Sequence, residues 1–502
     1  MNHVLCGLAD NTALPPELVD RLIAVADADG DAYDDLARHL AGRADLTRAQ
    51  AVALCSRVED TGVQLAYEGR LTVDDVDPGV WPDAALAMLD EGAGDPEWGR
   101  LLVRDPVDRR REKLAACAGL PADVVETLAA DPNVEVVEEL ALWTTPEVAT
   151  GLAGHPYVEV RRGVAANEAT PPAVLAALIS GEGLPPARRC VVCDREATPP
   201  DRELPPGASC DGSHESAVYG LRYAAIGNPS TPVEAVVGFV DDPSTLLRKS
   251  LADRPDLPPE VSERLAVDPE PWVRARLAET PVIDGALMRA LAEDPDHDVR
   301  LGLANNPHVP LDVLARLAAT TRLRVSPLPR IAAASPAEVE ELAQSPDAAV
   351  RMLVAERRDL PDGIRDALAT DPDAKVLKSV APHPGLSDAQ LRAMVHRHGV
   401  RVLAKVATNP DATPALLEDL TRHEPPVRKA LREIARHPRA TAPALLACLA
   451  ERDTRSVAAG HPALPPQVIT ELLTDSDQQV AEAAAAIPSL PVAVMAELVP
   501  RL

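Results

Sequence analysis

The chain has 502 residues and carries 50 Lys and Arg against 78 Asp and Glu, which gives a formal net charge of −28. Hydrophobic residues make up 46% of the sequence, which is enough to bury a core and excludes wholesale disorder. The acidic balance argues against a general binder of nucleic acids or of anionic membranes.

The composition restricts what the core can contain. There are only 4 Trp, 5 Tyr and 1 Phe, so the interior must consist of Ala, Leu and Val. Such an interior suits closely packed helices better than sheets, whose strands favour β-branched and aromatic residues. The 50 prolines cannot lie inside long helices. We therefore expect an all-α chain of many short helices.

The chain shows no targeting signal. Its first residues, MNHVLCGLADNTALPP, lack the basic region and apolar core of a signal peptide, and no apolar run approaches the ~20 residues of a membrane span. Cys6, Cys55, Cys117 and Cys448 are scattered in helical patterns and are interpreted as small buried hydrophobic residues. The excess of Arg over Lys, with abundant Ala and Pro, is typical of a GC-rich bacterial genome. We expect a cytoplasmic bacterial protein.

A repeated pattern runs along the chain from residues 4–25 onward. Taking Val299 as the reference, equivalent apolar residues recur every 25 or 26 residues, and a proline usually follows eight residues later. Residues 62–108 fit this pattern poorly. A fixed period of this length predicts a solenoid, here of about seventeen repeats. The clearest equivalent positions are Leu221, Leu247, Val273, Val325, Val350, Val376 and Val402.

Each repeat is predicted to contain two helices. An Asp-Pro pair such as Asp294-Pro295 opens the first helix, with Asp as the N-cap and Pro at the first helical position. A second pair such as Asn306-Pro307 ends it, because proline disfavours α geometry in the residue before it. Neither helix is long enough to be stable alone, so we expect neighbouring repeats to stack around a continuous core.

Arginines follow the reference position in many repeats. In three consecutive repeats an aspartate lies six residues earlier, and two interpretations are possible. The arginines form either a ribbon for anionic ligands or an Asp–Arg ladder between stacked layers, and we favour the ladder. The three pairs are Asp242/Arg248, Asp268/Arg274 and Asp294/Arg300.

The repeat pattern DPxxxVRxxLAxNPxLPxxVLxxLA resembles the leucine-rich repeat variant (LRV) family, a relative of HEAT and armadillo repeats. The resemblance implies an α-α superhelix and implies no reaction. By this pattern the chain has three parts: N-terminal helical repeats at 1–185, an insertion at 186–217, and C-terminal helical repeats at 218–502. Within the first part the pattern is irregular at 62–108.

The insertion concentrates three of the seven cysteines in 21 residues. Cys190-x2-Cys193 forms a knuckle whose two thiolates can share one metal. Cys210 and His214, four apart, are expected on the first turn of a helix, facing the same side. Three cysteines and one histidine close a tetrahedral shell, which is the chemistry of a structural zinc site.

An iron–sulfur cluster is the alternative to zinc at this site. Residues 210–214 read Cys-Asp-Gly-Ser-His and resemble the signature of the CDGSH iron–sulfur family. That resemblance implies a [2Fe–2S] cluster with Cys210 and His214 as two of its ligands. The first pair here is CxxC and not CxC, however, and the gap to Cys210 is much longer. The pattern looks more like a treble-clef or ribbon-type zinc finger, so we expect zinc, with an iron–sulfur cluster as the alternative.

No enzyme motif is visible. The sequence has no nucleophile elbow, P-loop, GxGxxG or HExxH, so no catalytic or cofactor-binding residue is assigned. We expect a scaffold for a protein or peptide partner, and an acidic surface favours a basic one. The alternatives are an iron–sulfur redox or iron-sensing protein and a nucleic-acid binder; the net charge, scarce lysines and scarce aromatics argue against the latter. The oligomeric state stays open.

Overall fold

A computed structural model describes residues 2–26, 31–194, 209–281, 283–323 and 327–500. Within these ranges the chain is all-α: 35 α-helices and a few 3₁₀ turns, without a β-strand. None of these helices is both long and apolar enough to cross a membrane. The predicted all-α solenoid of paired short helices is confirmed.

The chain forms two compact units, and α5 (Glu59–Tyr67) and α21 (Leu311–Thr320) cross the boundaries between them. The second unit, Ala66–Leu317, contains the insertion predicted at 186–217. Its other helices are α6 (Pro82–Asp90), η1 (Pro96–Trp98), α7 (Gly99–Leu102), α8 (Asp108–Ala116), α9 (Ala122–Ala129), α10 (Val134–Trp143), α11 (Pro146–Leu152), α12 (Val158–Ala166), α13 (Pro172–Ser180), α14 (Glu215–Gly227), α15 (Val233–Val236), η3 (Val237–Asp241), α16 (Thr245–Ala252), α17 (Pro259–Leu265), α18 (Pro271–Glu279), α19 (Gly285–Leu291) and α20 (His297–Asn305).

The first unit joins the two ends of the chain, Met1–Leu65 and Ala318–Leu502. Its helices are α1 (Asn2–Asp10), α2 (Pro16–Val25), α3 (Asp31–Ala41), α4 (Arg48–Cys55), α22 (Pro329–Ala332), α23 (Pro336–Ala343), α24 (Ala348–Ala355), α25 (Asp362–Leu368), α26 (Ala374–Val380), α27 (Asp388–His398), α28 (Val400–Ala407), α29 (Pro414–Thr421), α30 (Arg428–Arg436), α31 (Ala442–Leu449), η4 (Arg452–Thr454), α32 (Arg455–Ala459), α33 (Pro466–Leu472), α34 (Gln478–Ala485) and α35 (Val492–Leu498).

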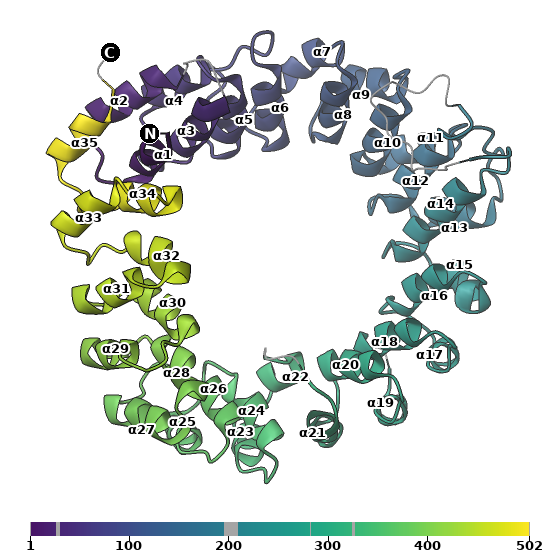
Figure 1. The fold of residues 1–502 in the computed structure, drawn as a ribbon. Helices are drawn as coiled ribbons and strands as arrows, with labels where there is room; N and C mark the ends of the chain where they lie inside the picture. Colours follow the sequence, from purple (N-terminus) through teal and green to yellow (C-terminus); the bar gives the residue numbers. More distant parts are fainter. Residues whose placement is uncertain (1, 27–30, 195–208, 282, 324–326, 501–502) are drawn as a thin grey trace. The chain divides into compact units, whose positions relative to one another are not determined.

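In each unit the helices form two layers (Figure 1). From α6 onward the even-numbered helices pack on one another in sequence, for example α8, α10, α12 and α14, and the odd-numbered helices cover them on one side. Near the N-terminus α1 and α3 belong to the first of these layers, and α2 and α4 belong to the second. Where the side chains are described, the buried hydrophobic core consists of Leu, Val, Ala, Ile, Met and Cys, without Phe, Tyr or Trp. The composition therefore predicted the interior correctly.

The second X-Pro pair of each repeat does more than end a helix. Asn306 is fully buried, and its Nδ2 donates to the carbonyl oxygens of Ala278 at 2.9 Å and Thr280 at 2.6 Å, which belong to the preceding repeat. Its Oδ1 accepts the N–H of His308 at 2.8 Å, which shapes the turn. One side chain thus fixes its own turn and satisfies the carbonyl groups left unpaired at the end of the neighbouring helix.

The same hydrogen bonds recur along the stack, and we call this series of bonds the turn ladder. Asparagine, histidine and arginine can all form these bonds, because each side chain has an N–H group that can donate to a carbonyl oxygen of the preceding repeat. Histidines that precede a proline at the turn therefore also join neighbouring repeats. The side chains observed in this role are Asn11, Asn167, Asn228, Asn306 and Asn409, then His383, His437 and His461, and finally Arg43, Arg254 and Arg357.

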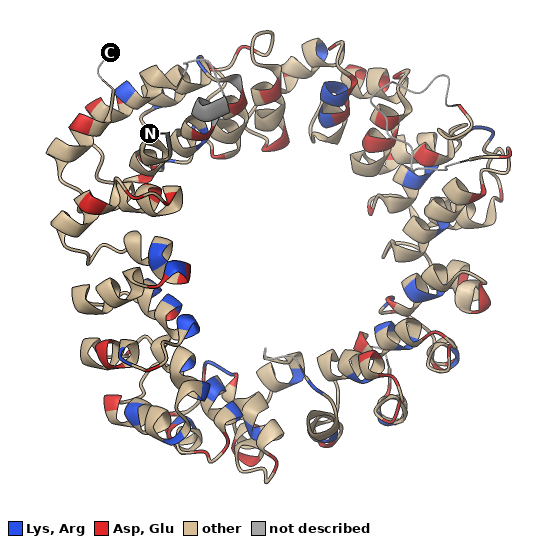
Figure 2. Cartoon of the chain, in the orientation of Figure 1, with Lys and Arg blue, Asp and Glu red and all other residues tan. Residues whose placement is uncertain are grey.

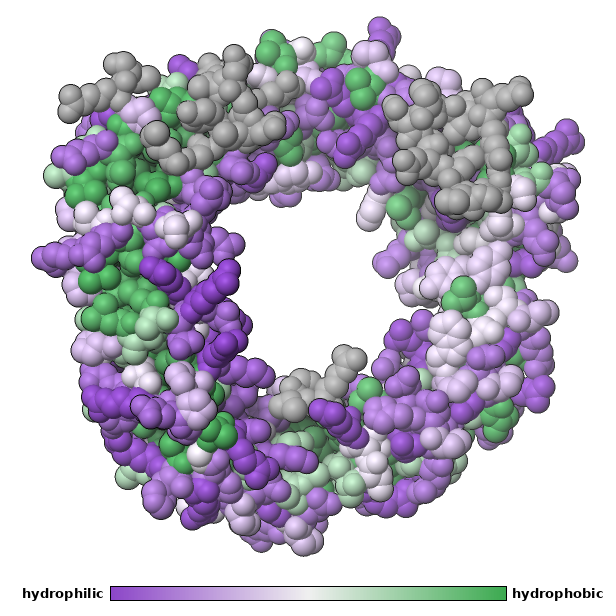
Figure 3. Space-filling model, in the orientation of Figure 1, coloured by the Kyte–Doolittle hydropathy of each residue, from purple (hydrophilic) through white to green (hydrophobic). Residues whose placement is uncertain are grey.

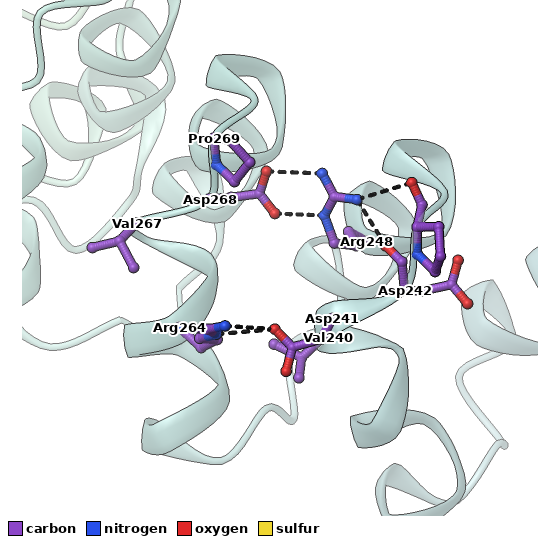
Figure 4. A pocket seen from close by; sticks show the side chains of 9 residues that line it. Val240, Asp241, Asp242, Arg248, Arg264, Val267, Asp268 and Pro269 are labelled. Carbon is purple, nitrogen blue, oxygen red and sulfur yellow. Dashed lines mark hydrogen bonds and ion pairs between the residues drawn. The ribbon is translucent and has the colours of Figure 1, made fainter.

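The predicted Asp–Arg ladder is present (Figure 4). Arg248 donates from Nε and Nη2 to the carboxylate of Asp268 at 2.6 and 3.1 Å, and from Nη1 to the Asp242 carbonyl at 2.8 Å. The guanidinium therefore ties the start of its own repeat to the start of the next one. Although this pair lines a pocket of about 340 Å³, its charges already satisfy each other. Equivalent pairs are Arg111–Asp131, Arg274–Asp294 and Arg351–Asp371.

The predicted role of the Asp-Pro aspartate as an N-cap is wrong. The N-cap of α20 is Asp296, whose side chain accepts the N–H of Asp298 at 2.8 Å. Asp294 lies two residues earlier and accepts the N–H of Asp296 at 2.8 Å. The guanidinium of Arg274 in the preceding repeat donates to the same carboxylate, so this aspartate joins two repeats at the turn while Asp296 caps the helix.

The N-terminal repeat continues the C-terminal stack in the first unit. Helix α1 packs on α34 as successive even-numbered helices pack elsewhere. Asn11 donates to the carbonyl oxygens of Ala485 at 3.0 Å and Ile487 at 2.7 Å, which is the turn-ladder bond. Gly7 lies so close to α34 that a Cβ there would overlap the Glu482 carbonyl oxygen. The first and last repeats thus use the same contacts as neighbours in the middle of the chain.

We predict that Gly7→Ala loosens the contact between α1 and α34. The added methyl group overlaps backbone of α34, and such overpacking costs about 1–3 kcal/mol. Hydrogen exchange of the amides in α1 and α34 should become faster, and the midpoint of chemical denaturation should fall. The control is Gly363→Ala in α25, where a Cβ meets nothing within 4 Å, so stability should stay equal or rise. Equal protection of α1 in both variants would contradict the close approach.

Candidate metal centre

The four residues predicted as metal ligands lie together in the second unit. The Sγ atoms of Cys190, Cys193 and Cys210 and a ring nitrogen of His214 are all within 4.8 Å of one another. The two sulfur atoms of the first pair are 3.5 Å apart. His214 Nδ1 lies 3.4 Å from Cys210 Sγ and 3.8 Å from Cys193 Sγ. Three sulfur atoms and one imidazole nitrogen therefore converge on one point, where they can hold a metal ion.

The first pair is held by its own backbone. The N–H of Cys193 points at Cys190 Sγ at 3.4 Å, and the N–H of Cys190 points at Cys193 Sγ at 3.2 Å. Cys190 is buried whereas Cys193 is exposed. Amide groups aimed at sulfur stabilise thiolates, so this knuckle is arranged to hold two negative sulfur ligands.

The second pair is placed differently from the expectation. Cys210 and His214 do not lie on the first turn of a helix, because α14 begins only at Glu215. His214 is the N-cap residue and has left-handed backbone geometry, with φ of 55°. The turn before it contains Gly212 with φ of 92°. This tight turn folds Cys210 back toward the imidazole, so the two ligands meet through a loop and not through helical spacing.

The cysteines of the site differ in their affinity for protons. Burial raises the pKa of Cys190 to about 12. Burial acts in the same direction on Cys210, but hydrogen bonds from the backbone N–H groups of Gly212 and His214 outweigh it and hold the pKa of Cys210 below its ordinary value. A metal ion binds thiolates, so its charge would offset the cost of the buried negative sulfur at Cys190.

A buried glutamate supports the knuckle and was not found from the sequence. Glu159, in the first turn of α12, is 6% exposed, and its Oε1 accepts the N–H of Val191 at 2.9 Å. Its Oε2 has no hydrogen-bond partner among the described residues. The equivalent positions of other repeats are half-buried, as at Glu135, or exposed, as at Asp298. Glu159 is buried only because the insertion covers it, and nothing in the local sequence signals this.

A second anchor joins the insertion to the turn before α12. The carbonyl oxygen of Arg189 accepts the N–H of Val158 at 3.2 Å, and the Arg189 guanidinium lies 4.7 Å from the centre of the Tyr157 ring. The same guanidinium donates to Asp194 at 2.6 Å. Burial and the hydrogen bond to Asp194 raise the pKa of Tyr157 to about 12. The knuckle therefore rests on the repeat stack through the Tyr157 ring and the Arg189 backbone, and the Arg189–Asp194 ion pair lies within the insertion itself.

The insertion leaves the stack of repeats uninterrupted. Helix α14 packs on α12 as α12 packs on α10. Asn228, after the insertion, still donates to the carbonyl oxygens of Ala165 and Asn167, each at 2.9 Å. Residues 195–208 between the two ligand pairs lie outside the described residues. The site is thus attached to the side of a continuous solenoid.

The other four cysteines are buried in helical packing, as expected. Burial raises the pKa of Cys117 and of Cys448 to about 12, which makes both thiols poor nucleophiles and poor ligands. The interpretation of Cys6, Cys55, Cys117 and Cys448 as small hydrophobic residues is confirmed by their burial.

Comparison with known proteins finds matches among solved structures only. The solved structure of a leucine-rich repeat variant, described as having a novel repetitive protein structural motif, is similar over 62% of this chain and 87% of its own. The sequence identity is 20% and the TM-score is 0.22. No protein-family model and no curated protein matches the chain. Within the described residues the protein is an all-α helical-repeat solenoid with a Cys₃His group that can hold a metal ion.

We predict that metal binding by this group requires Cys193. Cys193→Ala removes one of four ligands and should lower the metal content from about one ion per chain to near zero. Because Cys193 is exposed and outside the repeat core, the helical content measured by circular dichroism should stay unchanged. The control is Cys448→Ala, which leaves the site intact. Equal metal content in both variants would contradict the assignment.

Proposed function

We propose that the protein is a non-enzymatic scaffold that binds a basic segment of a partner protein. The observation that carries this proposal is a pocket of about 530 Å³ on the even-numbered helices of the second unit. The pocket spans α8, α10, α12 and α14. Its lining is acidic and partly apolar, and includes Glu112, Glu135, Glu138, Glu139, Leu142 and Tyr223.

The chemistry of this pocket suits lysine or arginine side chains. Four carboxyl groups are gathered around it, while Arg162, which pairs with Glu138, is the one basic side chain of the lining. Tyr223 is exposed in the wall, and Trp143 stands beside the pocket with 62% of its surface exposed. The indole N–H of Trp143 donates to Glu139 at 2.7 Å. An aromatic face next to carboxylates accommodates both the alkyl stem and the cation of a basic side chain.

Binding explains this pocket better than catalysis does. Its lining residues are Glu, Leu, Arg, Gly, Ala and Tyr, so it contains neither a Ser, Thr or Cys nucleophile nor a histidine base. Exposed Trp and Tyr are the residue types that dominate protein interfaces. We infer that the protein acts by recognition.

The metal that we propose is zinc, in a structural role. A tetrahedral zinc ion, with bonds of about 2.3 Å to sulfur and about 2.0 Å to nitrogen, sets its ligand atoms about 3.5–3.8 Å apart. The observed separations of 3.4, 3.5 and 3.8 Å fit one such ion. With four protein ligands the shell is closed, so the metal would brace the insertion against α12 and α14 and would leave no position for a substrate.

The alternative, an iron–sulfur redox or sensing centre, is less well supported. In a [2Fe–2S] cluster the ligands of opposite irons are separated by the sulfide bridge and lie more than about 5 Å apart. All four donor atoms here lie within 4.8 Å of one another. Their compactness favours a single ion.

Metal analysis with a visible spectrum tests the zinc proposal, on protein purified without oxygen or chelators. We expect about one zinc per chain and no absorbance in the visible region. About two irons with matching sulfide and a visible band would replace zinc by a [2Fe–2S] centre and make redox sensing the leading function.

Fluorescence anisotropy tests the scaffold proposal, with a labelled 15-residue peptide rich in Lys and Arg as the probe. Replacing Glu135 and Glu139 by Gln should weaken its binding by about tenfold, because two of the pocket's charges are lost. The matched control replaces the exposed Glu147 and Glu168, which lie outside the pocket, and should change binding less than twofold. Equal losses in both variants would contradict the pocket as the binding site.

A further inference from the structure

The lysines of this chain are concentrated in one part of the first unit. Of the six lysines in the sequence, four lie between residues 375 and 429. Together with two arginines they occupy three successive even-numbered helices, α26, α28 and α30. We call these six residues the basic strip: Lys375 and Lys378, Arg401 and Lys405, Lys429 and Arg432.

The members of the basic strip share one face. In each helix the two cations are three or four residues apart, which places them on the same side. Lys375, Arg401 and Lys429 also stand in the same register, each eight residues before its own turn-ladder residue. Because α26 packs on α28 and α28 on α30, equal register aligns these three side chains in a row across the layers.

The basic strip is accessible and carries uncompensated charge. Five of its side chains are exposed and Lys378 is half-buried. Within the described residues none of the six forms an ion pair with a carboxylate, and Arg432 donates only to the backbone carbonyl oxygen of Asp453 at 3.4 Å. Helices α26 and α28 contain no acidic residue, and α30 contains only Glu433, which lies 4.0 Å from Arg436. Nearby Asp453 pairs with Arg428. Figure 2 shows the basic residues along these helices, and Figure 3 shows a hydrophilic surface there.

An uncompensated row of cations is unexpected in a chain with a net charge of −28. We propose that the basic strip binds an extended acidic segment of a partner protein. This inference rests on the proposed scaffold function and adds a second binding surface with the opposite preference. Charge complementarity of this kind selects the partner and raises the rate of association.

The spacing of the strip fits a peptide. Packed helices lie about 8–10 Å apart, and an extended chain advances about 3.3 Å per residue. Carboxylates at every third residue therefore meet successive helices of the strip. Nucleic acid is a poorer occupant, because α26, α28 and α30 contain no aromatic residue on which a base could stack.

The test is fluorescence anisotropy on the full-length protein at low salt. The probe is a labelled 18-residue peptide of Gly and Ser with Glu at every third position, and its reference is the same peptide with Gln in place of Glu. Changing Lys375, Arg401 and Lys429 together to Glu should weaken binding of the Glu peptide by at least about tenfold, and added salt should weaken binding to the wild type.

The matched control changes Arg358, Arg422 and Arg439 to Glu, which alters the net charge equally at exposed positions outside the strip. This variant should bind within about twofold of the wild type. Absence of binding, equal binding of the Gln peptide, equal losses in both variants, or tighter binding of a 20-base-pair DNA duplex would overturn the inference. If the basic peptide still binds the second unit in that case, the scaffold function stands without the strip; if neither peptide binds, both proposals fail.

Discussion

The structure depends on a hydrogen bond from one side chain to the carbonyl groups of the preceding repeat. A helix of seven to ten residues leaves a large share of its carbonyl groups unpaired at its end. Buried beside a neighbouring repeat, those groups would each cost free energy of unfolding if they had no partner. A residue such as Asn306 supplies the missing donors and shapes its own turn. Short helices broken by proline can therefore stack closely without a large aromatic core.

The metal-binding group makes use of this rigid stack. Since Asn228 reaches back to Asn167 across the insertion, the insertion can project sideways while α12 and α14 remain neighbours. The knuckle is then fixed to the turn before α12 by the Arg189 backbone and to α12 itself by Glu159. The repeat stack positions one ligand pair, the N-terminus of α14 positions the other, and the donor atoms meet because the stack holds α12 and α14 together.

The repeat length and the composition were sufficient to predict the fold. In a solenoid the same contact recurs about every 26 residues, so the residues that make it recur at equivalent positions of the sequence. The Asp–Arg ladder could be predicted for the same reason. The ligand set was recognisable because Cys190, Cys193, Cys210 and His214 stand out in a cysteine-poor chain. The turn ladder was missed because three different side chains perform one role. The burial of Glu159 could not be predicted, because it depends on where an irregular insertion folds back.

The distribution of charge gives this solenoid more than one kind of surface. A uniform net charge of −28 would repel every acidic partner and attract basic partners without discrimination. The carboxylates around Tyr223 instead lie beside aromatic surface, so a partner there is selected by its shape as well as by its charge. On α26, α28 and α30 the sign is reversed, and Asp453 and Glu433 nearby pair with Arg428 and Arg436. Helices that are interchangeable in the core thus differ on their exposed faces, where the packing between repeats places few constraints on the side chains.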